Sequence, residues 1–327
     1  MRPDVPRLAT VHSLLSAWAR CQQIDVRRYR ASGNRGTLLD RDFSLGQGAR
    51  WLADRVLDGW LPPSLIVDHH SHVPLFSRLM LAPEAMAWRN RLMTGGCARD
   101  PSAGSIRRLN QVESATLRRC PTCVALDQLR YGHAHWRLHH QWPVARHCAE
   151  HGDALETCCS RCKSPFTRHG APHLADDPCP LCGGVRGEAK AWAAPPGYWP
   201  MLREMFRLLQ LGLCESDEIP FAMPVRGWTP RGIGAMIERK GLPAPVHQTL
   251  SAWRVDSLPK LANQLGENWV WFNSHETSAH RHQWPPLVSL AIRVSGIVAS
   301  NEDSTETWRP AGAPVPAAKP GAGRLAA

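Results

Sequence analysis

Lysine is scarce in this chain: only five of its 39 basic residues are Lys, and the others are Arg. Long apolar runs are also missing, because the most apolar stretch, residues 287–298, is short and contains Arg293. The opening residues 1–10 hold no apolar segment of the kind found in a signal peptide. These absences argue against a membrane protein and lead us to expect a cytoplasmic one.

The common catalytic motifs are absent as well. The sequence contains no GxxxxGK[ST] phosphate loop, no GxGxxG dinucleotide loop and no HExxH metalloprotease helix. Its acidic residues fall mostly in loops or on helix faces that we expect to be exposed, where a carboxylate is ordinarily solvated. Three acids could still converge in the fold without leaving a motif, as in transposases. With that alternative open, we expect a protein that is not an enzyme.

The charge is strongly unbalanced, with 39 basic against 28 acidic residues and a net charge of +11. Arginine carries a planar, multi-donor guanidinium that suits phosphate and carboxylate groups. A GC-rich genome would raise Arg together with Ala, Pro and Gly, and that would explain the ratio of Arg to Lys but not the net charge. The balance therefore favours nucleic acid or an acidic protein surface as the partner.

Cysteine occurs 11 times, an odd number, and mostly in short pairs. A C-x2-C or C-x2-H step presents both donors to one cation, because the tight turn between them places both on the same side. Paired spacing, an odd count and the missing export signal favour metal-bound thiolates over disulfides. Four such pairs supply eight candidate ligands for two structural zinc ions: Cys120 with Cys123, Cys148 with His151, Cys159 with Cys162, and Cys179 with Cys182.

The two pairs of half-sites differ in spacing. Sixteen residues separate the third pair from the fourth, which is common for zinc sites, whereas 24 separate the first pair from the second, as in a finger with a long insertion. Cys158 competes as a donor, since it precedes Cys162 by four positions. The x2 spacing favours Cys159 over Cys158.

Two groups of histidines accompany these pairs. Residues 68–72 read Asp-His-His-Ser-His, and we interpret them as a polar loop rather than a metal site because no Cys stands nearby. The second group is interpreted as solvated or packing residues, because the four pairs already close both sites: His133, His135, His139 and His140.

Apolar residues at helical spacing predict a mainly α fold around a central, irregular double zinc-finger module. Helices are expected within residues 1–60, from Glu84 to Met93, from Asp127 to His140 and after Leu202. The expected divisions are an N-terminal helical part (1–115), the zinc-finger module (116–188), a C-terminal helical region (189–300) and a tail (301–327). We expect this tail to be disordered, because it is largely Ala, Pro and Gly and cannot bury a core.

Residues 228–266 resemble a helix-turn-helix. One predicted helix follows Thr229 and Pro230, a second begins at Val246, and a third follows Ser257. The second helix would read DNA, since Gln and Ser can reach base edges and Arg can also contact phosphate. A plain helical bundle with a solvated polar face fits the same pattern. The candidate DNA-binding residues are His247, Gln248, Ser251 and Arg254.

One enzymatic alternative uses the same cysteines. Cys148-Ala-Glu150 followed by Pro178-Cys179-x2-Cys182 matches the signature of zinc-dependent nucleobase deaminases. Such an enzyme needs an open position on a three-ligand zinc. It would account for three of the eight donors, whereas two closed sites account for all of them, so we favour the closed sites.

The cysteine segment resembles the TniQ/TnsD family of bacterial transposition proteins. The matching residues are Arg119, Cys120-Pro-Thr-Cys123, Asp127, Trp136, Cys148-Ala-Glu-His151-Gly152, Leu155, Cys159-Ser-Arg-Cys162 and Cys179-Pro-Leu-Cys182. Ser13-Leu-Leu-Ser16 and the run from Pro285 to Ile292 resemble the family's first and last helices. Ser160 stands where the family usually has Pro.

The resemblance implies a non-catalytic adaptor that selects target DNA in transposition. Such proteins recruit an AAA+ ATPase, which in turn engages the transposase. Some members bind DNA through helix-turn-helix segments, and others dock as dimers on an RNA-guided CRISPR complex. A stand-alone zinc-containing DNA-binding regulator is the alternative.

Overall fold

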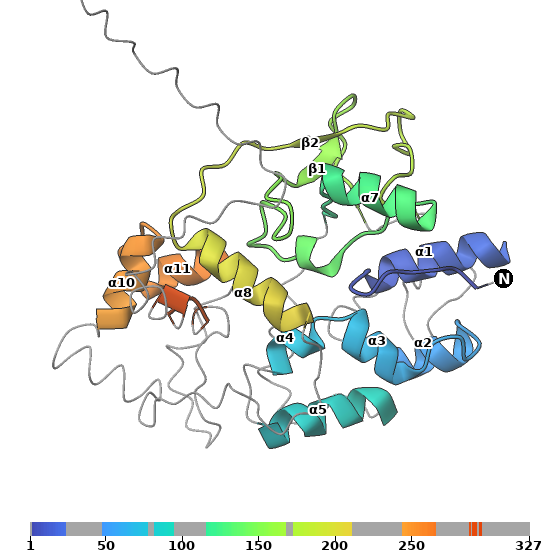
Figure 1. The fold of residues 1–327 in the computed structure, drawn as a ribbon, viewed down its shortest axis with the longest axis horizontal. Helices are drawn as coiled ribbons and strands as arrows, with labels where there is room; N and C mark the ends of the chain where they lie inside the picture. Colours follow the sequence, from blue (N-terminus) through green and yellow to red (C-terminus); the bar gives the residue numbers. More distant parts are fainter. Residues whose placement is uncertain are drawn as a thin grey trace, which may run out of the picture.

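The computed structural model describes residues 2–23, 48–77, 82–94, 116–167, 173–210, 244–265 and six positions between 288 and 295. These residues form a helix-rich fold with little strand, as the sequence predicts (Figure 1). The helices are α1 (Val11–Gln22), α2 (Ala49–Arg55), α3 (Pro63–His69), α4 (Val73–Ser77), α5 (Ala82–Thr94), α7 (Pro121–Tyr131), the 3-10 helix η5 (Leu138–His140), α8 (Tyr198–Gln210), α10 (Ala244–Ala252) and α11 (Leu258–Leu265). The strands β1 (Glu156–Cys159) and β2 (Gly187–Ala189) pair antiparallel.

Helix α8 crosses the middle of the molecule (Figure 1). The segment holding α7, β1 and β2 lies on one side of it, and α2 to α5 lie on the other. Its apolar face is buried at Met201, Leu202, Met205, Leu208 and Leu209, and it contacts both α4 and η5. One buried apolar cluster includes residues from the N-terminal helices, α8, α10 and α11. A second, smaller cluster lies within the cysteine segment and contains Leu117, Ala134, Trp136 and Ala175.

Helix α1 forms for the reasons that the sequence indicates. Thr10 caps it, because the Thr10 hydroxyl oxygen accepts a hydrogen bond from the backbone N–H of Ser13 at 3.1 Å. Leu14, Leu15 and Trp18 are buried at helical spacing. The predicted helix is confirmed.

Residues 68–72 are not the polar loop that we expected from their sequence. Helix α3 includes the first two of these residues, and His70, Ser71 and His72 are buried in the turn before α4. His70 Nδ1 lies 2.9 Å from the Ala9 carbonyl oxygen, and His72 Nε2 lies 3.2 Å from that of Leu138. Tertiary packing against α1 and η5 buries this segment, because its ring nitrogens pair with backbone carbonyls that lie far away in sequence.

The helix expected from Asp127 to His140 is also wrong in its bounds. Helix α7 begins at Pro121 and ends before Gly132, whose φ of 78° terminates it. Leu129 is 85% exposed, whereas Trp136 is buried in the irregular segment after the helix. Proline at the first helical position sets the start, and this helix buries little beyond Cys123 and Asp127.

At the C-terminal end, α10 and α11 match the second and third helices predicted for residues 228–266. Leu258, Leu261 and Leu265 are buried, as their spacing predicts. The first predicted helix, around residues 230–240, lies outside the described residues, as does the predicted tail. Two of the three expected helices are therefore present, separated by residues 253–257.

A tight contact joins α8 to α10. The backbone N–H of Gly197 donates to the Ala252 carbonyl oxygen at 3.0 Å, and a Cβ added at Gly197 would lie 2.6 Å from Trp253 Nε1. Trp253 is buried and cannot turn away freely. We expect Gly197→Ala to lower the free energy of unfolding by about 1–3 kcal/mol.

Denaturant unfolding tests this expectation, with Ser251→Ala as the control. Ser251 is exposed on α10, so its replacement should change stability by less than about 0.5 kcal/mol. Equal midpoints for the two variants would contradict the packing described at Gly197.

None of the helices in the described part of the chain has both the length and the apolar character needed to span a bilayer.

Candidate metal centres

Eight cysteine and histidine side chains come together in two groups. The first cluster consists of Cys120, Cys123, Cys148 and His151, and the second consists of Cys159, Cys162, Cys179 and Cys182. Within each cluster the candidate ligand atoms all lie within 4.8 Å of one another. All four C-x2 pairs thus lie where a cation could be shared, in the grouping that their spacing indicates.

Three of the four pairs sit on the same kind of turn. In each, the backbone N–H of the leading cysteine donates to the carbonyl oxygen five residues later, and the N–H four residues later donates back to the cysteine carbonyl, at 2.8–2.9 Å. The residue that follows the second Cys or His of each pair has a positive φ: 77° at Gly152, 61° at Lys163 and 69° at Gly183. The glycines suit this conformation, and Lys163 adopts it at a cost. The turns that begin at Cys148, Cys159 and Cys179 follow this pattern.

The remaining pair opens α7 instead. Cys120 is the N-cap of this helix, and its sulfur accepts the backbone N–H of Cys123 at 3.4 Å. Pro121 occupies the first helical position, which aligns the helix start with the sulfur. Helix capping and metal-donor placement therefore depend on the same cysteine.

The distances in the first cluster suit a tetrahedral ion. His151 Nδ1 lies 3.6 Å from the sulfur of Cys120, 3.2 Å from that of Cys123 and 3.5 Å from that of Cys148. The Cys123 and Cys148 sulfurs are 3.8 Å apart. Zinc bonds of about 2.3 Å to sulfur and about 2.0 Å to nitrogen give tetrahedral edges of about 3.8 Å and about 3.5 Å. These four distances are therefore close to those expected around a metal ion.

The second cluster has similar spacing. The Cys159 and Cys182 sulfurs are 3.5 Å apart, and those of Cys162 and Cys179 are 3.6 Å apart. Four thiolates around a dication are typical of structural zinc sites. Gly184 lies against this cluster, because a Cβ there would be 3.1 Å from the Cys159 sulfur.

Backbone N–H groups favour the thiolate form at two of the four sulfurs in the second cluster. The N–H of Cys162 lowers the pKa of Cys159 to about 6, and the N–H of Leu181 lowers the pKa of Cys179. Donors that point at sulfur stabilise the thiolate, which is the form that binds metal.

The structure also distinguishes the two adjacent cysteines of β1. Cys159 is buried within the second cluster, whereas Cys158 is outside it and its sulfur lies 3.9 Å from the Glu188 carbonyl oxygen. Successive side chains in a strand point to opposite faces, which separates the two sulfurs.

His139 and His140, which we expected to be solvated or packing residues, also lie close to the first cluster. Both are buried, and with Cys123 and Cys148 they form a third group whose candidate ligand atoms lie within 4.8 Å of one another. His140 Nε2 is 3.4 Å from the Cys148 sulfur and 3.8 Å from that of Cys123. Both histidines belong to η5, which lies close to Cys123 of α7. Their spacing from the cysteines in the sequence matches no ligand pattern.

Arg119 connects the two clusters, a role that sequence reasoning did not assign. Its guanidinium donates to the Glu156 carboxylate at 2.8 Å, to the Val185 carbonyl oxygen at 2.8 Å and to the Ala175 carbonyl oxygen. It precedes Cys120 of the first cluster, and Glu156 opens the strand that leads to Cys159 of the second. Its position next to a C-x2-C pair was the only sequence signal.

A second ion pair shapes the first cluster. Asp127 is 1% exposed and forms an ion pair with Arg137, and it also accepts the backbone N–H of His135 at 3.2 Å. These contacts fix the segment between α7 and η5.

The three cysteines that a deaminase would use as zinc ligands lie in different clusters. Cys148 belongs to the first cluster, whereas Cys179 and Cys182 belong to the second. The three do not meet around one cation in the described part of the chain.

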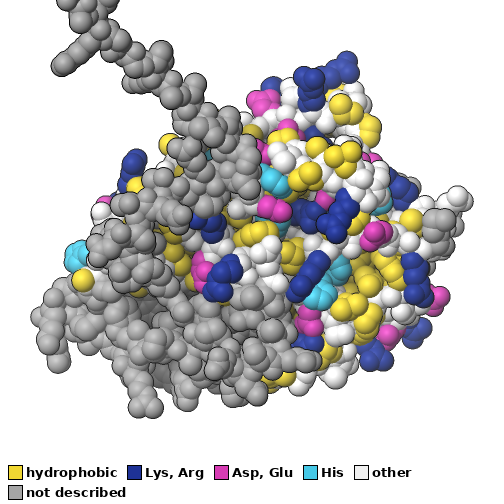
Figure 2. Space-filling view, viewed as in Figure 1, with side chains coloured by type: hydrophobic (Ala, Val, Ile, Leu, Met, Phe, Trp, Pro, Cys, Tyr) yellow, Lys and Arg dark blue, Asp and Glu magenta, His cyan; other side chains and the backbone are white. Residues whose placement is uncertain are grey.

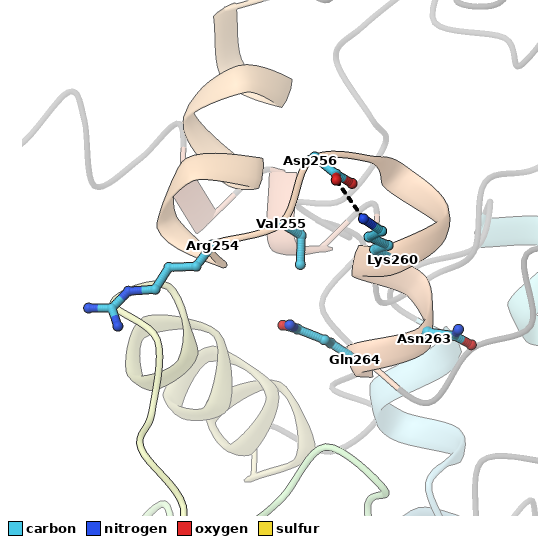
Figure 3. A pocket seen from close by; sticks show the side chains of 6 residues that line it. All are labelled: Arg254, Val255, Asp256, Lys260, Asn263 and Gln264. Carbon is cyan, nitrogen blue, oxygen red and sulfur yellow. Dashed lines mark hydrogen bonds and ion pairs between the residues drawn. The ribbon is translucent and has the colours of Figure 1, made fainter.

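The four candidate DNA-binding residues are all exposed on or just after α10: His247, Gln248, Ser251 and Arg254. Arg254 follows the end of α10 with a φ of 54°. An open cavity of 640 Å³ lies between this turn and α11, lined by Arg254, Val255, Asp256, Lys260, Asn263 and Gln264 (Figure 3). Lys260 is paired with Asp256 at 2.5 Å, while Arg254 extends away from that pair (Figure 3).

Basic side chains do not gather in one patch on the face drawn in Figure 2. They are spread across it, with acidic side chains between them. The side chains coloured in this view therefore form no single basic surface.

No protein-family model and no curated protein matches this chain.

Proposed function

We propose that this protein is a non-catalytic adaptor for bacterial DNA transposition, which brings an AAA+ ATPase, and through it the transposase, to the target DNA. The observation that carries the proposal is the cysteine segment. Its TniQ-like order of C-x2 pairs folds into two adjacent four-donor clusters that Arg119 connects. The deaminase signature shares these cysteines, but its ligands are divided between the two clusters.

Each cluster holds a structural zinc ion in this proposal. Cysteine and histidine donors at tetrahedral spacing favour zinc among the common cellular metals. Four protein donors leave no open position for water or substrate, which suits a structural role. Such zinc sites contribute on the order of 10 kcal/mol to folding, and here they support a segment with only two short strands.

DNA contact is assigned to the exposed face of α10 and the turn after it. Helices α10 and α11 would form the second and third helices of the helix-turn-helix that the sequence predicts for residues 228–266. The exposed face offers amide, hydroxyl and guanidinium groups that suit base edges and phosphates: His247, Gln248, Ser251 and Arg254.

Arg254→Ala tests the DNA contact. We expect weaker DNA binding and a salt dependence whose logarithmic slope falls by about one unit, because one phosphate contact is lost. The measurement is a fluorescence-anisotropy titration of duplex DNA at several salt concentrations. Arg50→Ala is the control, since Arg50 is an exposed arginine on α2 that pairs with Asp54. An unchanged slope for Arg254→Ala would place the DNA contact elsewhere.

A stand-alone DNA-binding regulator is the second candidate, because the exposed polar face of α10 suits either role. The two functions differ in their partners. Co-purification with an AAA+ ATPase supports the adaptor, and tight operator binding without ATPase association supports the regulator. An ATPase that binds only when an RNA-guided CRISPR complex is present would assign target choice to that complex.

A further inference from the structure

The sulfurs of Cys123 and Cys148 are each contacted by two histidines. His151 Nδ1 lies 3.2 Å and 3.5 Å from them. His140 Nε2 lies 3.8 Å and 3.4 Å from the same two atoms. The two sulfurs are 3.8 Å apart, which is about the edge of a zinc tetrahedron. One pair of sulfurs thus forms part of two four-donor groups.

A single tetrahedral ion cannot use all of these donors. Together the two groups contain six residues, namely Cys120, Cys123, His139, His140, Cys148 and His151, and structural zinc takes four. Two ions that share the Cys123–Cys148 edge would use all six, with two terminal donors each. Thiolate sulfur has the lone pairs to bridge two cations.

Three of the four ring nitrogens of His139 and His140 have no hydrogen-bond partner among the described residues. These are both ring nitrogens of His139 and Nδ1 of His140, although the two residues are only 2% and 1% exposed. Buried polar groups are ordinarily satisfied, so these nitrogens beside two sulfurs call for a ligand. Phe206 of α8 packs against His139, with ring centroids 4.5 Å apart, and holds it beside His140.

Charge balance supports a second cation. One dication with three thiolates carries a net charge of −1, whereas two dications with the same thiolates carry +1. The Asp153 carboxylate lies 3.2 Å from the Cys120 sulfur. A negative carboxylate is repelled by the first arrangement and attracted by the second.

We propose that the Cys123–Cys148 edge bridges two zinc ions, one completed by Cys120 and His151 and the other by His139 and His140. This inference rests on the metal site of the first cluster proposed above. It raises the expected zinc content to three ions per chain, because the second cluster holds one more.

Elemental analysis of the full chain, purified without chelator, tests the count. We expect three zinc ions for the wild type, two for His139→Leu/His140→Leu, and one for Cys123→Ser, which removes a donor shared by both ions. His135→Leu is the matched control and should retain three. His135 is also a buried histidine without a hydrogen bond from its ring among the described residues, but it lies outside the clusters.

X-ray absorption on the wild-type protein tests the geometry without any variant. We expect a short zinc–zinc scattering path, which should vanish in His139→Leu/His140→Leu while zinc–sulfur scattering remains. Two ions per chain and no zinc–zinc path would overturn the proposal, whatever the variants do. That result would leave the adaptor function standing if ATPase recruitment and DNA binding persist, whereas three ions without either activity would refute the adaptor and support the shared edge.

Discussion

Cys159→Ser is expected to lose one zinc ion per chain, unfold the second cluster and abolish targeted insertion, whereas Cys158→Ser leaves all three properties intact. Cys159 is buried among the four sulfurs of the second cluster, and its thiolate is stabilised by the N–H of Cys162. A serine hydroxyl is a poor zinc ligand, so the variant should lose much of the zinc-binding free energy, which is on the order of 10 kcal/mol. Cys158 provides the same chemical change one residue away, outside the cluster.

The comparison uses two measurements on the same preparations. Elemental analysis reports the metal content, and insertion by the reconstituted ATPase and transposase reports the function. Equal zinc content in both variants would contradict the second metal centre. If Cys159→Ser loses zinc but still supports wild-type insertion, the second cluster is a metal centre that target selection does not need.

Replacing Arg119 is expected to destabilise the fold more than any surface arginine. Arg119 and Glu156 form an ion pair whose side chains are 6% and 17% exposed. Arg119→Met strands the Glu156 carboxylate and the carbonyl oxygens of Ala175 and Val185, and removing one partner of such a buried pair costs about 3–5 kcal/mol. We expect a loss of unfolding free energy in that range, measured by denaturant titration with zinc present.

Two variants control this experiment. Arg207→Met removes an arginine that is 54% exposed and pairs with Glu204, so the loss should stay below about 1 kcal/mol. Arg119→Met/Glu156→Gln removes the stranded charge and should recover part of the stability. If Arg119→Met costs no more than Arg207→Met, Arg119 does not hold the two clusters together.

The buried Tyr198, the first residue of α8, connects this helix to the cysteine segment. The hydroxyl oxygen of Tyr198 accepts the backbone N–H groups of Arg146 and His147 at 2.8 Å and 3.0 Å. Burial raises the pKa of Tyr198 to about 12, so the phenol keeps its proton over the ordinary pH range. This contact joins the C-terminal helices to the turn that carries Cys148.

The sequence by itself determined the features that depend on neighbouring residues. A C-x2 pair needs only one tight turn, so each half-site is visible as a local pattern. Helices α1, α8 and α11 follow from apolar residues at helical spacing, because one face of each is buried.

Tertiary structure alone decided the features that depend on distant contacts. Residues 68–72 look polar in sequence but are largely buried, because carbonyls near α1 and in η5 satisfy their rings. His139 and His140 carry no ligand spacing, yet η5 brings them to sulfurs of two separate C-x2 pairs. Arg119 reaches Ala175 and Val185 only once the chain has folded back across more than fifty residues. A periodic pattern records which face of an element is buried, but it does not record what that face meets.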